Sequence, residues 1–128
     1  MKLISGSALL AGILVAATGA LAQAAAPAKV AETSKGKALV DAKGMVLYTF
    51  DRDAAGKSNC NGQCAQNWPP LIATAGTSAS GDWTIVTRDD GSRQWAYKGK
   101  PLYLWVKDTK PGEVTGDGVN NVWHIATP

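Results

Sequence analysis

The residues with the most reactive side chains in this sequence are Cys60 and Cys64, the only two cysteines of the chain. Two cysteines can form a disulfide, act as reactive or regulatory thiols, or bind a soft metal such as copper or zinc. Neither a Cys-x-x-Cys nor a Cys-x-x-Cys-His pattern is present. In an oxidising compartment, a disulfide is the simplest prediction.

The spacing of the two cysteines restricts the structure between them. Residues i and i+4 of a regular helix have Cβ atoms about 5 to 6 Å apart, whereas a disulfide needs about 3.8 Å. We therefore expect Asn61-Gly62 to break any helix here. The closed loop is so short that the bond contributes only about 2 kcal/mol, which stiffens a loop but does not hold the fold together.

His124 is the only histidine. With one histidine, this chain cannot by itself build a Ser-His-Asp triad or a multi-histidine zinc site. The position of His124 between Trp123 and Ile125 favours a structural role. We predict no catalytic residue, no metal site and no cofactor, and we expect that the protein is not an enzyme.

The N-terminal segment, residues 1–24, has the three parts of a secretory signal peptide. Lys2 is followed by an apolar run over residues 3–17 and by Ala22-Gln23-Ala24, which fits a cleavage site. The run is shorter than the roughly 20 apolar residues of a membrane-spanning helix. Both cysteines lie far downstream of it. We therefore expect a periplasmic or secreted protein with no lipid anchor and no transmembrane segment after cleavage.

Charge and length exclude other classes of protein. Of 13 basic residues, Lys2 is lost with the signal peptide, which leaves 12 basic and 10 acidic residues. The basic residues are spread singly, with no run that would neutralise several phosphates, so nucleic acid is not an expected partner. The 128 residues are too few for two enzyme domains.

Short β-type runs separated by turn residues indicate an all-β domain. They cover residues 38–42, 45–51, 83–88, 93–98, 101–107 and 122–126. Asp89-Asp90-Gly91 predicts a hairpin turn between two of them. At most one short helical turn is expected, around Cys60 to Trp68. Residues 25–37 are small and polar, which predicts a flexible lead-in to a single domain over residues 38–128.

The mature sequence contains an internal repeat. Sliding the chain along itself, without a gap, aligns residues 36–73 with residues 91–128. The identical pairs are Gly36/Gly91, Lys43/Lys98, Gly44/Gly99, Leu47/Leu102, Tyr48/Tyr103, Asp53/Asp108 and Trp68/Trp123. Since one hairpin alone is marginally stable, we predict an antiparallel β domain, sandwich or barrel-like, in which two pseudo-symmetric repeats close a common core.

The pattern Tyr-x-[Phe/Trp/Tyr]-x-x-Asp occurs in both repeats, at residues 48–53 and 103–108. With the stretch Cys-x-x-x-Cys-x-x-x-Trp-Pro-Pro at residues 60–70, the chain resembles the small bacterial family of secreted or lipoprotein repeats with this motif. The resemblance implies an extracytoplasmic β domain and supplies no reaction. Many relatives carry a lipid-attached cysteine after the signal, which this sequence lacks.

The motif residues have two interpretations. Residues two apart on a strand share one face, so Tyr48 with Phe50, and Tyr103 with Trp105, form two stripes that favour a core. Each aspartate follows its strand and is suited to accept N–H bonds from the next loop. The alternative is a ligand platform of exposed aromatic rings and carboxylates. Its candidate binding residues are Tyr48, Phe50, Asp53, Trp68, Tyr103, Trp105, Asp108 and Trp123.

Two functions remain open at this point. The first is a non-catalytic exported binding or envelope-associated module, whose partner is an unknown envelope protein or small molecule. The second is a small periplasmic redox or metal-handling protein that uses Cys60 and Cys64, with Met45 or His124 as further candidates.

Overall fold

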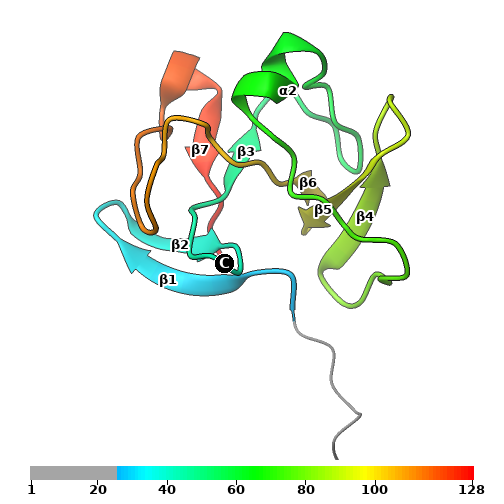
Figure 1. Cartoon of the computed structure of the whole chain (residues 1–128), viewed down its shortest axis with the longest axis horizontal. Helices are drawn as coiled ribbons and strands as arrows, with labels where there is room; N and C mark the ends of the chain where they lie inside the picture. Colours follow the sequence, from blue (N-terminus) through cyan, green and yellow to red (C-terminus); the bar gives the residue numbers. More distant parts are fainter. Residues whose placement is uncertain (1–25) are drawn as a thin grey trace, which may run out of the picture.

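The computed structural model describes residues 26–128, so the predicted signal peptide at residues 1–24 lies outside the described residues. The described strands form three small antiparallel sheets of two, two and three strands, with one short α-helix and one 3-10 turn. The predicted all-β fold is confirmed. Figure 1 shows a hairpin on each side of the molecule and β3 (Tyr48–Phe50) between them. Neither helix within this part of the chain is long and apolar enough to cross a membrane.

The first hairpin pairs β1 (Lys29–Thr33) with β2 (Gly36–Val40). The Thr33 hydroxyl closes the turn by donating to the carbonyl of Gly36 over 2.7 Å. This hairpin corrects the flexible lead-in predicted over residues 25–37, because β1 and the start of β2 are ordered there. The polar composition was misleading: β1 is an edge strand with three exposed residues, and an edge strand needs little apolar surface.

The second hairpin pairs β4 (Trp83–Thr87) with β5 (Arg93–Tyr97), which also pairs with β6 (Lys100–Pro101). In its turn, the backbone N–H of Arg88 donates to the carbonyl of Ser92 over 2.8 Å. Gly91 adopts a φ of 88°, in the left-handed region that glycine tolerates. The predicted hairpin around Asp89-Asp90-Gly91 is therefore confirmed.

The two hairpins are equivalent, but their registers differ slightly. The bridge between Val40 and Val46 in the first repeat corresponds to the pair Ala96 and Pro101 in the second. The gapless alignment places Val46 on Pro101 but places Val40 on Trp95, one position before Ala96. Counted between the innermost paired residues, the turn between β4 and β5 in the second repeat is one residue longer than the turn between β1 and β2. The turn after β5 is one residue shorter than the turn after β2. These two changes cancel, so the sequences align without a gap.

The aromatic strands are exchanged between the repeats. β3 of the first repeat pairs with β7 (Trp123–Ile125) of the second. In the equivalent place, Tyr103 of the second repeat bridges Pro70 of the first, and the N–H of Leu104 donates to the carbonyl of Pro69 over 2.7 Å. Pro69 occupies the position of His124. Because proline has no N–H to return the bond, residues 103–105 do not form a regular strand.

The helix α2 (Gln63–Asn67) lies within the predicted helical turn. It begins only after Gly62, whose φ is 55°, so Cys60 precedes the helix and Cys64 lies in its first turn. The Cα atoms of the two cysteines are 5.2 Å apart and their side chains form a disulfide. The predicted disulfide, and the predicted break before the helix, are confirmed. The 3-10 turn η1 (Val119–Asn121) occupies the corresponding place in the second repeat.

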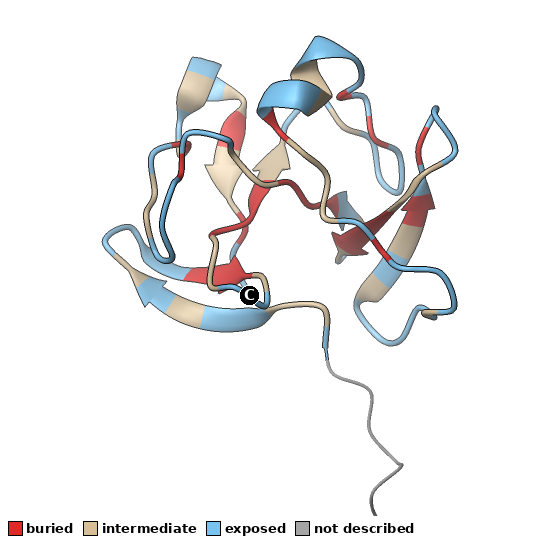
Figure 2. Ribbon diagram, in the orientation of Figure 1, coloured by how far each residue is buried: buried red, intermediate tan, exposed pale blue. Residues whose placement is uncertain are grey.

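Buried residues fill the centre of the molecule between the two hairpins (Figure 2). The larger cluster contains Ala38, Val40, Val46, Tyr48, Cys60, Trp68, Tyr103 and Trp123. A smaller cluster contains Leu39, Leu47, Leu102 and Ala126. Both clusters take residues from both repeats, so neither repeat has a separate core.

Candidate binding site between the repeats

Tyr48 and Tyr103, the two motif tyrosines, meet at the centre of the fold. Their backbones exchange two hydrogen bonds of 2.8 and 2.9 Å, and both side chains are fully buried. The Tyr48 hydroxyl donates to the carboxylate of Asp108 over 2.5 Å. The Tyr103 hydroxyl donates to the carboxylate of Asp53 over 2.7 Å. Each motif tyrosine therefore contacts the motif aspartate of the other repeat.

Each motif aspartate also fixes the loop that follows it. Asp53 accepts the backbone N–H of Asn59 over 2.7 Å. Asp108 accepts the backbone N–H and the hydroxyl of Thr115 over 2.9 and 2.6 Å. This is the loop-fixing geometry predicted for the two aspartates. Both carboxylates are thus engaged in hydrogen bonds within the fold.

Burial changes the titration of these groups. It raises the pKa of Tyr48 well above its ordinary value, and the hydrogen bond to Asp108 raises it further. Burial likewise raises the pKa of Tyr103. The pKa of Asp53 is raised by burial, against the opposing effect of the hydrogen bonds from Asn59 and Tyr103. Both tyrosines are therefore neutral at pH 7 and donate to the carboxylates.

A buried arginine extends this network beside Tyr103. Arg88 donates to the hydroxyl of Ser58 over 2.9 Å, to the side-chain oxygen of Gln94 over 2.7 Å and to the carbonyl of Cys60 over 2.6 Å. Its Nε is buried without a partner among the described residues. The Ser58 and Tyr103 hydroxyls lie 2.6 Å apart. The sequence analysis missed this group, because a charged residue at the end of a strand normally faces solvent.

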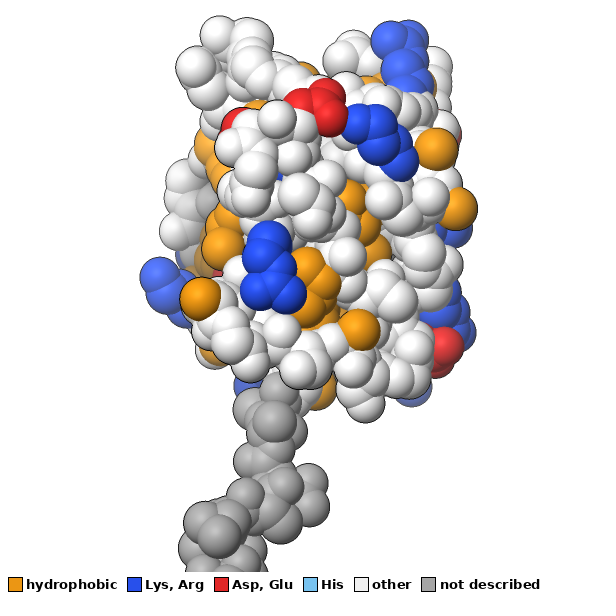
Figure 3. Space-filling view, turned by 90° about the vertical axis from the view of Figure 1, so that its right-hand side faces the viewer, with side chains coloured by type: hydrophobic (Ala, Val, Ile, Leu, Met, Phe, Trp, Pro, Cys, Tyr) orange, Lys and Arg blue, Asp and Glu red, His pale blue; other side chains and the backbone are white. Residues whose placement is uncertain are grey.

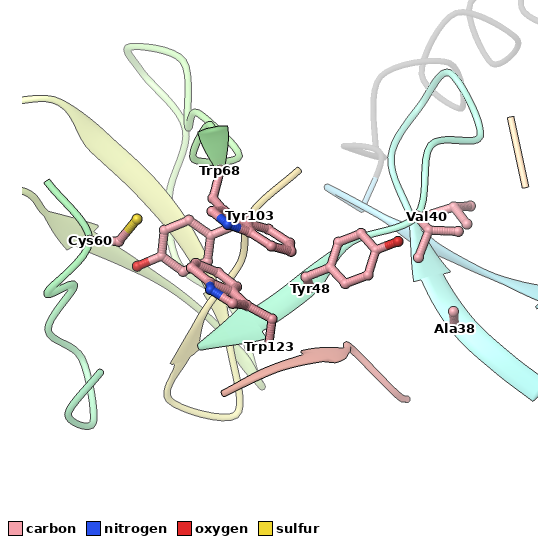
Figure 4. Close-up of a cluster of buried hydrophobic side chains, with 8 residues drawn as sticks. Ala38, Val40, Tyr48, Cys60, Trp68, Tyr103 and Trp123 are labelled. Atoms are coloured by element: carbon pink, nitrogen blue, oxygen red, sulfur yellow. The ribbon is translucent and has the colours of Figure 1, made fainter. Parts of the chain in front are cut away.

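Four aromatic rings form a continuous stack across the repeat boundary. In order they are Phe50, Trp123, Trp68 and Trp105, with ring centroids 4.2, 3.8 and 3.9 Å apart. The order alternates between the two repeats. Figure 4 shows the side chains of Trp68, which directly follows α2, and of Trp123 in β7 extending toward each other. Aromatic pairs typically add about 0.5 to 1.5 kcal/mol per pair beyond area burial.

A groove of about 560 Å³ opens on one side of this stack. We call it the stack groove. Its floor consists of Phe50, Trp68 and Trp123, and its remaining lining residues are Arg52, Asn59, Gln63, Cys64, Asn67, Asn120 and Val122. The volume lies within the range of about 300 to 1,000 Å³ that is typical of small-molecule sites. An aromatic floor with a few polar groups around it is also typical of such sites.

The structure separates the candidate binding residues into two groups and leaves Trp105 outside both. Phe50, Trp68 and Trp123 line the stack groove. Tyr48, Asp53, Tyr103 and Asp108 belong to the crossed hydrogen bonds between the repeats. Trp105 ends the ring stack, with the ammonium of Lys107 at 5.9 Å from its ring centroid. The two motif copies thus do not form one exposed platform of rings and carboxylates.

The residues considered for redox or metal chemistry lie in different surroundings. Cys64 is half-buried and lines the stack groove, whereas Cys60 is fully buried. His124 is half-buried, and its Nε2 lies 2.7 Å from a carboxylate oxygen of Asp51. Within residues 26–128, no three His, Cys, Asp or Glu side chains come together in a way that could hold a metal ion.

Basic side chains are dispersed over the side of the molecule shown in Figure 3, and hydrophobic side chains reach the surface between them. At the surface, Lys57 is paired with Asp89 at 2.6 Å. This face has no continuous basic strip, which agrees with the sequence, where Lys and Arg are spread singly and not in runs.

Comparison with known proteins agrees with the internal repeat. A family model described as a secreted repeat of unknown function matches the chain twice, at residues 29–72 and 84–127. The second match follows the first at the offset of the gapless alignment, which confirms the duplication. The matches begin at residues 29 and 84 rather than at 36 and 91, so each includes most of the outer strand of its hairpin. No curated protein and no solved structure matches the chain.

Proposed function

The chain belongs to the family of secreted repeats of unknown function, and on that premise we propose that it is an exported, non-catalytic binding module whose ligand occupies the stack groove. It acts in the periplasm or outside the cell, without a lipid anchor. Both cysteines of the sequence lie inside the folded domain and are joined to each other, which supports an unacylated protein.

The observation that carries this proposal is that the motif residues and the groove residues have different contacts. The motif tyrosines and aspartates are used internally, in bonds between the repeats. The stack groove, in contrast, combines aromatic rings with exposed amide side chains from α2 and η1. Rings held by stacking on both sides of the boundary form a rigid floor, and a rigid site binds at a lower entropic cost.

Several features support a binding role without catalysis. Catalysis of acyl or glycosyl transfer uses a nucleophile with a base, or two carboxyl groups flanking the substrate. Among the described residues that line the stack groove, there is no histidine and no carboxylate. His124 is held by Asp51 outside it. A ligand in the groove is therefore contacted by amides, one guanidinium, aromatic rings, Val122 and the disulfide-bonded Cys64, none of which is a general base at neutral pH.

The proposal is tested by NMR with small saccharides, peptides, nucleotides and lipid head groups. We expect at least one class to shift the amide signals of α2 and η1 in the wild-type protein. Gln63→Arg, which places a bulky charge in the groove, should abolish the shifts. Gln66→Arg is the matched control, because Gln66 is exposed on the same helix but does not line the groove. The ligand should be recovered chemically unchanged.

Shifts confined to another surface, or no shifts with any of the four classes, would contradict this site. Conversion of a ligand into a product that requires the groove residues would contradict the absence of catalysis.

A second function is favoured by the position of the disulfide. Because Cys64 lines the groove and Cys60 is buried, an incoming thiolate would attack the sulfur of Cys64, form a mixed disulfide with it and release Cys60 as the thiolate. A small thiol-exchange protein would then use the groove to hold its partner. Exchange with glutathione that is slow, and unaffected by Gln63→Arg, would argue against this alternative.

A further inference from the structure

We propose that the ligand of the stack groove is a short oligosaccharide that carries acetamido groups and one carboxylate. This inference rests on the proposed binding function and names the chemical class of the ligand. It follows from three properties of the groove: the pairing of its amides, its single charge, and the absence of a free strand edge among its described residues.

The first property is a wall of amides with unused hydrogen-bonding groups. Gln63 and Asn67 are four residues apart on α2, so their side chains leave the helix on the same face as the groove. Asn120 projects from η1 with a φ of 52°, a left-handed conformation that asparagine tolerates. None of these three side chains forms a hydrogen bond within residues 26–128. Each amide therefore offers both a donor and an acceptor to a ligand.

Asn59 completes the polar lining and is held in place. Its side-chain nitrogen donates to the carbonyl of Arg52 over 2.8 Å, and its backbone N–H donates to Asp53. The side-chain oxygen of Asn59 is left as an acceptor. Sugar hydroxyls both donate and accept, and acetamido groups do the same. A lining of amides, which both donate and accept, thus fits acetamido sugars better than it fits a ligand that only donates or only accepts hydrogen bonds.

The second property is charge. Among the described residues, Arg52 is the only charged side chain that lines the groove, and it is exposed. A guanidinium binds a carboxylate through two parallel N–H bonds. A ligand with several negative charges has no further cation to meet in this lining, whereas a cationic ligand meets repulsion. One carboxylate therefore fits the charge of the site.

The third property separates a saccharide from a peptide. Extended peptides bind by adding a strand to an open sheet edge. The strand β3 pairs with β7 along one edge, and on the other edge Tyr48 bridges Tyr103 and the carbonyl of Phe50 accepts the N–H of Asp53, so little of either edge is open to a further strand. The opposite edge of β7 is also occupied, because the N–H of Gly118 donates to the carbonyl of Trp123 and the N–H of Ile125 donates to Asp117. A ligand in the groove is therefore bound by side chains and not by the backbone hydrogen bonds of an added strand.

The tryptophans at the base of the groove present ring edges to it. Trp68 and Trp123 are only 4% and 3% exposed, and both faces of each ring are covered by neighbouring rings of the stack, so the base has no slots between rings of the kind that proline-rich peptides enter. Phe50 is more accessible than either. Because the two tryptophans lie at the base of the groove, a bound ligand should change their fluorescence.

The test is a fluorescence titration of the oxidised full-length mature protein with three disaccharides. They are N,N′-diacetylchitobiose, its counterpart in which one sugar carries a lactyl carboxylate, and cellobiose, which has no acetamido group. We expect the carboxylate-bearing sugar to bind about tenfold more tightly than diacetylchitobiose, about the effect of one charge-assisted hydrogen bond. Cellobiose should bind more weakly than either.

Variants assign the contacts. Arg52→Gln should remove the preference for the carboxylate, so that the carboxylate-bearing sugar binds no more tightly than diacetylchitobiose. Asn120→Ala should weaken both acetamido sugars by about five- to tenfold. Gln63→Arg should abolish binding of diacetylchitobiose, which has no charge to pair with the new guanidinium, and Gln66→Arg should not change it. Native near-UV circular dichroism in each variant shows that the fold is retained.

The outcomes separate this inference from the proposed function. If none of the sugars binds at millimolar concentration, the saccharide is excluded. If instead a dipeptide or tripeptide binds and Gln63→Arg abolishes that binding, the groove remains the binding site and only the ligand class is wrong. Equal binding of all three sugars, insensitive to Arg52→Gln and Asn120→Ala, would also overturn the inference.

Discussion

Tyr48 and Tyr103 are hydrogen-bonded to each other through their backbones, and each donates its hydroxyl to the aspartate that follows the other in its motif. The two repeats are therefore related by an approximate twofold axis that passes between these tyrosines. The ring stack obeys the same symmetry, since Trp68 and Trp123 are its two central members. The motif thus specifies how two repeats assemble.

Tyr48→Phe is expected to destabilise the protein by about 1.5 to 3 kcal/mol, the usual effect of losing a hydrogen bond to a charged group. The change leaves Asp108, which is 6% exposed, without one of its donors, and leaves the N–H of Gly116 without its acceptor. Urea unfolding followed by far-UV circular dichroism measures the loss.

Tyr97→Phe is the matched control for this change. The hydroxyl of Tyr97 forms no hydrogen bond within residues 26–128, and the ring is only half-buried, so its free energy of unfolding should change by less than about 0.5 kcal/mol. If Tyr48→Phe were as mild as Tyr97→Phe, the crossed hydrogen bonds would contribute little to the fold.

Much of this architecture could be predicted from local sequence. Gly91 and the residues around it determine a hairpin turn, and the gapless alignment of the repeats indicates a duplication. A disulfide at the short spacing of Cys60 and Cys64 requires that any helix here is broken at Asn61-Gly62, and α2 indeed begins only after Gly62. The aspartates follow their strands, where a carboxylate accepts N–H bonds from the next loop. In most of these cases the signal and its consequence lie within a few residues of each other.

The exchange between repeats could not be predicted in this way. The residues around Tyr48 in the sequence are the same whether its hydroxyl binds Asp53 or Asp108. Because both repeats carry the motif, the sequence does not show which copy supplies the aspartate. Arg88 was missed for a related reason: its acceptors Ser58, Gln94 and the Cys60 carbonyl converge only after folding. The stack groove depends likewise on α2 and η1, which come from different repeats.

High pH is expected to unfold the protein through its buried tyrosines. Burial raises the pKa of both Tyr48 and Tyr103 in the folded state, whereas an unfolded tyrosine has a pKa of about 10. The folded state therefore binds more protons than the unfolded state above about pH 10. The contribution to stability is complete below about pH 10 and is lost as the pH rises toward the raised values.

Urea unfolding at a series of pH values, with absorbance in the near ultraviolet to detect tyrosinate, measures this effect. We expect the two buried tyrosines to ionise together with the loss of the near-UV circular dichroism signal. The double variant Tyr48→Phe, Tyr103→Phe should have a shallower pH dependence above about pH 10. Ionisation of both buried tyrosines in a protein that keeps its native near-UV signal would refute the assignment.

Gly116→Ala is expected to disturb the ring stack. A Cβ at this position would lie 2.9 Å from Trp68, 3.0 Å from Trp105 and 3.0 Å from Tyr48. All three are ring atoms of packed side chains, so relief requires movement of the stack, which costs about 1 to 3 kcal/mol. Gly36→Ala is the control, because nothing lies within 4 Å of a Cβ there and only its φ of 99° causes strain.

Thermal unfolding and near-UV circular dichroism compare the two glycine variants. Gly116→Ala should lower the melting temperature and also change the tryptophan signal, whereas Gly36→Ala should lower the melting temperature alone. An unchanged tryptophan signal in Gly116→Ala would mean that the glycine is not needed for ring packing.

Cleavage between the repeats is expected to leave them together. Residues 78–82 of the connector are exposed, so a protease site inserted after Ser78 is accessible. Because β3 pairs with β7 and Tyr48 pairs with Tyr103, both products share one core and should elute as one species of unchanged size.

Unfolding of the cut protein then separates two chains, so its melting temperature should rise with protein concentration. The uncut protein with the same insertion should show no such dependence. Elution of the two halves as separate folded species would show that the repeats do not depend on each other for their core.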